Sequence, residues 1–322
     1  MKDVIFRGEK LIDREDEIAS IKGWFEKLPK EILWIYGPKS SGKTTIIEYI
    51  VENELFEDFW SLKSSKYWVK YINFRRRLVS SYDTFLNSFI FPDDETIDEN
   101  LKIKLNLGVF KIDYTILGKI KEKELDLFDV LITELKRVKK QPIIIIDEIQ
   151  TLEDIYINGE RELLKEFLNF CVSLTKELHL SHVVILSSNT IFINKIYNDA
   201  KLKVTSKFYK IDHLSFDTVQ SWIEDDHKFQ KAEIELIWEY LGGSIAHIQR
   251  MIRDRDEFSS LKEYLDQQAF LAYTEMVLNY SQGNFSDKEK EIFEDICKNI
   301  LRDVKRRPPS MNCSCVNTFQ RT

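Results

Sequence analysis

The sequence predicts an α/β fold in which a parallel sheet carries helices on both faces and is followed by an all-helical segment. Short apolar runs of strand length alternate with helical periodicities over the first two thirds of the 322 residues. The run QPIIIIDE at 141–148 is almost continuously apolar, as a central strand covered on both faces requires. Residues 215–280 hold only helical periodicities. Strands that alternate with helices favour a parallel sheet with right-handed crossovers.

The expected elements follow one another along the chain. Apolar and β-branched runs predict strands at 31–37, 65–74, 141–148, 182–189 and near 207–211. Helical spacing of apolar residues predicts helices at 12–28, 44–55 and 159–178, with Asp13 placed to cap the first. Residues 80–140 are mostly helical in pattern, but an alternating stretch at 103–117 indicates an inserted hairpin. The sequence therefore predicts one sheet interleaved with helices.

Charge and cysteine usage exclude several classes of protein. Lys and Arg total 47 against 54 Asp and Glu, so the formal net charge is −7. A net acidic chain does not coat nucleic acid in bulk, and any DNA contact must come from a local basic patch. Four cysteines without an export signal favour a reducing cytoplasm over a disulfide framework. The longest purely aliphatic run, 143–146, is too short to span a bilayer, so we expect a cytoplasmic protein without membrane contact.

The change in character near residue 212 predicts three regions. Residues 1–212 form the α/β core, residues 213–280 the all-helical piece, and residues 281–322 a short C-terminal segment. The end of that segment has almost no periodicity and two adjacent prolines, which predicts a mobile tail.

A phosphate-binding motif lies between the first expected strand and its helix. Residues 37–44 match G-x-x-x-x-G-K-[ST] in full. Glycine lets the backbone turn so that successive N–H groups face phosphate oxygens, and the helix adds the positive end of its dipole. Lys43 can reach the β- and γ-phosphates, and the Thr44 hydroxyl can ligate Mg²⁺. The motif predicts a nucleotide cup made by Gly37, Pro38, Lys39, Ser40, Ser41, Gly42, Lys43, Thr44 and Thr45.

A pair of acids ends the strand at 141–148, where ligands bind in open α/β sheets. Asp147 would hold the Mg²⁺ shell, and Glu148 would polarise or deprotonate the attacking water. The extra strand between the two motifs fits the hydrolytic branch of P-loop proteins, in which another strand lies between the two that carry the motifs. The adjacent glutamate favours ATP hydrolysis over transfer to a small acceptor. No Asn-Lys-x-Asp tetrad is present, which favours adenine over guanine.

Three polar residues end the strand at 182–189, beside the acids. They are Ser187, Ser188 and Asn189. We expect Asn189 or Ser188 to sense the γ-phosphate or to orient the attacking water. Polar residues also end many strands without a catalytic role, and the sequence leaves that alternative open.

The chain resembles the archaeal ATPase family of P-loop proteins, within the STAND and AAA+-related group. The resemblance rests on Leu-Ile-Asp-Arg-Glu near the start, the loop at 37–44, Ile-Asp-Glu-Ile-Gln at 146–150, Ser187-Ser188, and Leu-Gly-Gly at 241–243. It implies a P-loop ATPase core, a helical lid over residues 213–280 and a C-terminal winged helix, of which 281–322 holds only the start. It also places Arg14 near the adenine and makes Gly242-Gly243 the start of a lid helix facing the nucleotide.

The chain departs from the family pattern at one charged position. The arginine that often follows the fourth core strand is missing, and the matching stretch offers Lys207. Lysine supplies a charge but no planar fork, which puts efficient hydrolysis through that position in doubt.

These residues predict a Mg²⁺-dependent ATPase in which ATP binding and hydrolysis drive a conformational change between the core and the lid. The alternative is a DNA-associated, initiator-like ATPase in which ATP tunes DNA affinity with little turnover, and a third reading is an inactive nucleotide-binding scaffold. Basic clusters at 75–77 and 302–307 are candidate DNA contacts, although in an acidic chain a solvated surface is the ordinary explanation. The expected partners are ATP and ADP, an unidentified protein effector and, on ATP binding, further copies of the chain.

Overall fold

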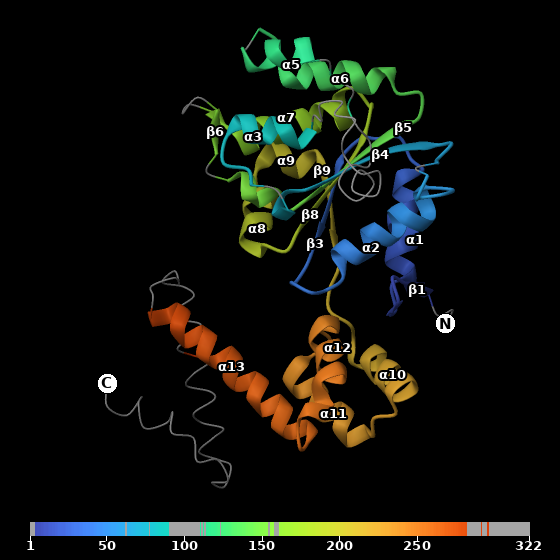
Figure 1. The fold of residues 1–322 in the computed structure, drawn as a ribbon, viewed down its shortest axis with the longest axis vertical. Coiled ribbons are helices and arrows are strands. Elements are labelled where there is room, and N and C mark those ends of the chain that lie inside the picture. Colours follow the sequence, from blue (N-terminus) through green and yellow to red (C-terminus); the bar gives the residue numbers. More distant parts are fainter. Residues whose placement is uncertain are drawn as a thin grey trace. The chain divides into compact units, whose positions relative to one another are not determined.

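The computed structural model (Figure 1) describes residues 4–61, 63–76, 78–89, 110, 112, 114–122, 124–153, 155–157, 161–281, 291 and 295. The chain divides into two compact units, residues 1–252 and 253–322. The predicted boundary at 212 lies inside the first unit and stays a prediction. The winged-helix start, the C-terminal tail and the basic cluster at 302–307 fall outside the described residues.

A five-stranded parallel sheet forms the centre of the first unit. Its spatial order is β4-β5-β8-β3-β9, and every neighbouring pair is parallel. The bounds are Ile32–Tyr36 for β3, Tyr67–Asn73 for β4, Gln141–Asp147 for β5, His182–Ser187 for β8 and Ser206–Lys210 for β9. The predicted strands are confirmed. β8 lies between β3 and β5, which carry the two motifs, as expected for the hydrolytic branch.

Successive side chains of each central strand belong in turn to two separate hydrophobic clusters, one on each face of the sheet. On β5, Ile144 and Ile146 belong to one cluster, while Ile143 and Ile145 belong to the other. The first cluster takes apolar residues from α3 (Tyr82–Phe89), α5 (Tyr114–Lys121), α6 (Leu127–Arg137), α7 (Leu163–Val172), α8 (Thr190–Asn198) and α9 (Ala200–Val204). The second takes them from α1 (Glu15–Phe25) and α2 (Lys43–Ile50). Helices therefore cover both faces, as Figure 1 shows for α2 and α7.

Short elements complete the core. π-helical turns at Val51–Leu55 and Ser173–Glu177 continue α2 and α7, and 3-10 turns occupy Phe74–Arg76 and Ile149–Leu152. A two-stranded sheet pairs β6 (Tyr156–Ile157) with β7 (Arg161–Glu162).

Only helices follow β9 among the described residues, as predicted. They are α10 (Phe216–His227), α11 (Lys231–Leu241), α12 (Ile245–Asp254), a 3-10 turn at Arg255–Glu257 and α13 (Leu261–Ser281). The hydroxyl of Ser215 accepts a hydrogen bond from the backbone N–H of Thr218 and caps α10. None of the described helices combines the length and the apolar character needed to cross a membrane.

The structure corrects the sequence analysis at three places. An antiparallel hairpin of β1 (Val4–Phe6) and β2 (Glu9–Leu11) opens the chain, where no strand was expected. Asp13 does not cap α1, because its backbone has a positive φ of 51° and its carboxylate accepts instead from the Thr218 hydroxyl, 2.7 Å away. The hairpin expected at 103–117 is wrong over residues 114–117, because α5 begins at Tyr114, whereas Phe110 forms a β-bridge. Residues 103–109 fall outside the described part.

The imidazole of His182 is buried at the start of β8 and gives the core a sensitivity to acid. His182 is 1% exposed, and its ring centroid lies 4.7 Å from that of Trp24 and 5.7 Å from that of Phe25. Neither ring nitrogen meets a hydrogen-bond partner among the described residues. Burial lowers the pKa of His182 to about 4, and the nearby backbone of Lys27 and Phe25 opposes the shift only in part.

This pKa predicts a loss of stability in mild acid. In the unfolded chain the His182 imidazole takes up a proton below about pH 6.5, whereas in the folded chain it does so only near pH 4. The free energy of unfolding therefore falls as the pH is lowered through that window. We expect a loss of about 3 kcal/mol in the free energy of unfolding from this group. Urea denaturation at a series of pH values measures it, with His182→Phe as the non-titrating variant. An equal loss in wild type and variant between pH 6.5 and 5 would contradict the assignment.

Candidate functional site

The loop at 37–44 has the backbone geometry of a phosphate cup. Gly42 precedes α2 in the left-handed conformation with φ of 88°, and Ser40 also has a positive φ of 65°. A Cβ on Gly37 would lie 1.9 Å from the Ile211 carbonyl oxygen, so only glycine fits there. Lys43 and Thr44 then open α2, whose first N–H groups have no intrahelical acceptor. The loop therefore combines free amides with a helix N-terminus.

The ammonium of Lys43 is folded into the loop. Its Nζ donates to the carbonyl oxygens of Gly37 at 3.0 Å and Pro38 at 2.6 Å, and lies 3.3 Å from the Ser41 hydroxyl. Burial lowers the pKa of Lys43, while Asp147 and Glu148 oppose the shift. An entering phosphate would replace the carbonyl partners and supply a full counter-charge, which favours the ammonium form.

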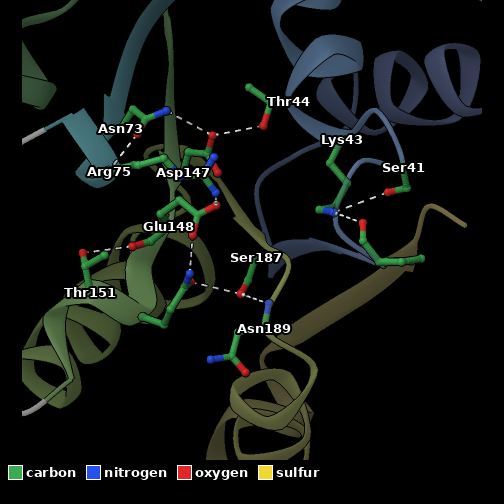
Figure 2. A network of polar contacts seen from close by, with 12 residues as sticks. Ser41, Lys43, Thr44, Asn73, Arg75, Asp147, Glu148, Thr151, Ser187 and Asn189 are labelled. Carbon is green, nitrogen blue, oxygen red and sulfur yellow. Dashed lines mark hydrogen bonds and ion pairs between the residues drawn. The ribbon is translucent and has the colours of Figure 1, made fainter. Parts of the chain in front are cut away.

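Asp147 faces the loop from the end of β5. Its Oδ2 accepts hydrogen bonds from Thr44 Oγ1 at 3.1 Å, Asn73 Nδ2 at 3.2 Å and the Tyr71 hydroxyl at 3.3 Å. The carboxylate is 4% exposed, and burial together with the charge of Glu148 raises the pKa of Asp147, against the hydrogen bonds of Thr44 and Tyr71. Figure 2 shows Thr44 and Asp147 pointing toward one another. The cup and the acid pair thus share one site.

The donor set between the loop and the acids suits magnesium. Thr44 Oγ1 and a carboxylate oxygen of Asp147 are hard oxygen ligands from two elements, 3.1 Å apart. Mg²⁺ in nucleotide sites takes one or two such protein oxygens, and phosphate and water complete its octahedron. The residues present therefore fit the ion.

Glu148 follows β5 with both carboxylate oxygens engaged. Its backbone is left-handed, with φ of 61°, and begins the 3-10 turn at Ile149–Leu152. Oε1 pairs with the Arg75 guanidinium, and Oε2 accepts from the side-chain amide of Gln150 (Figure 2). A water molecule that loses its proton to Glu148 must displace one of these partners. Since the Arg75 side chain is 65% exposed, it is the more easily displaced.

Ser187 is the β8 residue that joins the acid network in the described part of the chain. Ser187 is buried, and its hydroxyl donates to the side-chain carbonyl of Gln150 at 3.0 Å. The side-chain carbonyl oxygen of Asn189 caps α8 by accepting from the Phe192 N–H at 3.0 Å, and the backbone N–H of Asn189 donates to Ser187 Oγ. Asn189 and Ser188 stay predicted γ-phosphate contacts, and Ser187 reaches Glu148 through Gln150.

A cavity of about 280 Å³ lies beside the loop. Gly42 and Thr45 line it from the loop and α2, and Ile245 and Gln249 line it from α12. The N-terminal segment lines it with Phe6, Leu11, Ile12 and Arg14 among others, and α2 also contributes Ile46 and Glu48. Its mixed apolar and polar lining and its place next to the phosphate cup suit a nucleoside. Arg14, which the resemblance places near the adenine, lines this cavity, and so does Thr45 of the predicted cup.

Lys207 lies away from the predicted phosphate position. It is the second residue of β9 and pairs with Leu33 of β3, whereas the loop follows the carboxyl end of β3. At about 3.3 Å per residue, three residues separate it by about 10 Å from the end of β9. The structure therefore does not place Lys207 where charge on a γ-phosphate would be neutralised.

Four residues of the network escaped the sequence analysis: Tyr71, Asn73, Arg75 and Gln150. Tyr71 and Asn73 lie on one side of β4, and Asn73 pairs in register with Asp147. A signal for them existed, because polar residues at the carboxyl end of a strand next to an acid-bearing strand meet at one sheet edge. The strand order β4-β5, which makes them neighbours, cannot be read from β4 alone.

Comparison with known proteins places the chain in a family. A family model described as an ATPase domain predominantly from Archaea matches residues 11–251. The chain belongs to this archaeal ATPase family. An uncharacterized ATP-binding protein of Methanocaldococcus jannaschii is 33% identical over 319 residues, which cover 92% of this chain and 85% of that protein. One of Pyrococcus abyssi is 29% identical over 299 residues, covering 89% and 82%.

Solved structures with a similar fold are distant in sequence. The ORC2 protein of Aeropyrum pernix, in its ADPNP–ADP complexes, gives a TM-score of 0.48 at 15% identity, covering 84% of this chain and 71% of that one. AMPPCP-bound DnaA of Aquifex aeolicus gives 0.43 at 15% identity, covering 83% and 69%.

The contact between Arg75 and Glu148 yields a prediction for this member of the archaeal ATPase family. Removing the guanidinium with Arg75→Ala frees Oε1 of Glu148, and an exposed ion pair is worth at most about 1 kcal/mol. We expect the basal rate of ATP hydrolysis to rise by up to about fivefold at unchanged ATP affinity. Arg75→Lys, which keeps the charge, is the control in a steady-state phosphate-release assay. A fall in rate with the alanine variant would show that Arg75 assists the reaction.

Proposed function

We propose that the chain binds Mg²⁺-ATP between the loop at 37–44 and the acids at 147–148 and hydrolyses it. The bound nucleotide then controls a conformational change of the lid relative to the core. The observation that supports this most is the 3.1 Å contact between Thr44 Oγ1 and Asp147 Oδ2. It joins the phosphate loop to the acid-bearing strand, as a shared metal–phosphate site requires.

Each residue has a distinct role in this proposal. The loop amides and Lys43 bind the β- and γ-phosphates, and Thr44 and Asp147 hold the ion. Mg²⁺, when bound, supplies positive charge to the phosphate oxygens. Glu148 orients water toward the γ-phosphorus and accepts its proton once an oxygen is freed. The Gln150 amide donates to Glu148 Oε2 and is itself held by the Ser187 hydroxyl, which donates to the Gln150 side-chain carbonyl. These two hydrogen bonds limit the Glu148 carboxylate to one orientation.

The residues that line the cavity beside the loop support the proposed conformational change of the lid. Gly42 and Thr45 belong to the core, whereas Ile245 and Gln249 belong to α12. A nucleoside between them would make contacts that exist only when α12 is in place, so ATP would shift the population toward that arrangement. A protein effector and ATP-dependent self-association remain predictions.

Single-turnover hydrolysis by the purified chain tests this function. Enzyme in excess over γ-³²P-labelled ATP should release phosphate when Mg²⁺ is present and stop when EDTA is added. Tight ATP binding without any phosphate release would leave a nucleotide-binding scaffold. No binding at all would refute the site.

The second candidate, ATP-controlled DNA binding, has one observation in its favour. Arg75 is exposed and lies on Glu148, so an external phosphate could draw the guanidinium away and release the carboxylate. Duplex DNA should then bind with a steep salt dependence and raise hydrolysis in wild type but not in Arg75→Ala. No binding to duplex DNA at low salt would remove this candidate.

A further inference from the structure

The linker between β9 and α10, residues 211–214, packs closely on a glycine at each end, on Gly37 at Ile211 and on Gly243 at Leu214. The Ile211 N–H donates to the Tyr36 carbonyl at 2.8 Å, and the Ile211 carbonyl lies directly on Gly37 of the loop. At the other end the Leu214 N–H donates to the Gly243 carbonyl at 3.0 Å, and a Cβ on Gly243 would lie 1.9 Å from the Leu214 oxygen. The linker thus contacts the phosphate loop first and the turn before α12 last.

Arg14 joins the same loop to the middle of this linker. One nitrogen, Nη2, donates to the Ser41 carbonyl at 3.1 Å and to the Asp212 carbonyl at 2.8 Å. The other, Nη1, pairs with Glu17 Oε1 at 2.7 Å. The side chain is 6% exposed, so few alternative partners in water compete for these bonds. Its Nε is buried and meets no partner within the described residues.

The carbonyl that Arg14 holds belongs to a phosphate-binding peptide. The Ser41 carbonyl and the Gly42 N–H form one peptide unit, and that N–H lies at the start of α2 in the cup. A charged donor on the carbonyl polarises the amide and strengthens its N–H as a donor to phosphate. Conversely, a phosphate on the N–H strengthens the carbonyl as an acceptor for Arg14. Any shift of Nη2 toward Ser41 weakens its bond to Asp212.

We infer that Arg14 is a positioning residue that transmits phosphate occupancy of the loop to the lid, through the Asp212 carbonyl of the linker. This inference rests on the proposed function and names the route of its switch. Both Nη atoms are committed to protein acceptors, so Arg14 acts through the loop peptide and the linker. His213 adds a second loop contact on the same linker, since its Nε2 lies 3.2 Å from the Lys39 carbonyl.

Amide hydrogen exchange of the full chain, with and without Mg²⁺-ATP, separates the loop response from the lid response. In wild type, ATP should slow exchange in α2 and in α10–α12 by about fivefold or more, a typical coupling between two sites. In Arg14→Lys, which keeps a charge but cannot hold both carbonyls and Glu17, ATP should still protect α2 but no longer protect α10–α12. The matched control is Glu17→Gln, which removes only the negative charge opposite Nη1, leaves both carbonyl contacts of Nη2 in place and should respond like wild type.

Each outcome has one meaning. Protection of the lid in Arg14→Lys equal to wild type would overturn the role of Arg14 and leave the ATP switch intact. Protection of α2 alone in wild type would overturn the switch, and protection of neither would overturn ATP binding, each of them taking this inference with it. If Arg14→Lys does not give a wild-type melting transition, Arg14→Gln replaces it, because it keeps one donor without the charge.

Discussion

Glu148→Gln should bind ATP like wild type and lose almost all turnover. The amide keeps the size of the side chain and can still accept from Gln150, but it cannot take a proton from water. Loss of a general base costs about 10²–10⁴-fold in rate. The dissociation constant for ATP should stay within about threefold, because phosphate contacts come from the loop and Lys43.

The matched control for that variant is Glu153→Gln. Glu153 lies in the same segment and pairs with Lys195 at 3.1 Å, away from the acid network. Both variants lose one carboxylate and one ion pair, and only Glu148→Gln should stop single-turnover hydrolysis. Wild-type turnover by Glu148→Gln would remove Glu148 as the base and leave the binding site untouched.

Lys43→Ala should abolish tight ATP binding. The ammonium of Lys43 is buried against the loop, where it contacts the Gly37 and Pro38 carbonyls. Each charge-assisted hydrogen bond to phosphate is worth about 1.5–3 kcal/mol, so losing one should lower ATP affinity by about tenfold to about 150-fold. Isothermal titration with a slowly hydrolysed ATP analogue measures the loss.

Lys165→Ala provides the control for charge alone. Lys165 is exposed on α7, and the variant changes the net charge of the chain by the same amount as Lys43→Ala. Its ATP affinity should match wild type. If Lys43→Ala also bound ATP at the wild-type dissociation constant, phosphate would not occupy the loop as proposed.

Local pattern sufficed to predict the sheet but not the N-terminal hairpin. Four isoleucines before Asp147, and the motif after β3, identify buried strands because apolar runs of that length have few other solutions. β1 and β2 have three residues each, and their turn depends on positive φ at Arg7 and Gly8. Such short strands carry too little periodicity to be distinguished from loop.

The candidate site was predictable where one motif supplies all the geometry. The loop at 37–44 and the acids at 147–148 each carry their own backbone signal. Gln150 and Arg75 reach Glu148 only because a left-handed residue and a neighbouring strand bring them there. Ser187 also reaches the network through Gln150, and the strand pattern does not reveal this contact or the cap that the Asn189 side-chain carbonyl forms on α8.

The magnesium dependence of ATP affinity tests the shared site most directly. ATP binding should be tighter with Mg²⁺ than with EDTA in wild type, because Thr44 and Asp147 would hold the ion and the ion would supply positive charge to the phosphates. Thr44→Val and Asp147→Asn should each lose that gain while keeping the affinity measured in EDTA. An unchanged gain from Mg²⁺ in both variants would show that the loop and the acid pair do not hold one metal–nucleotide complex.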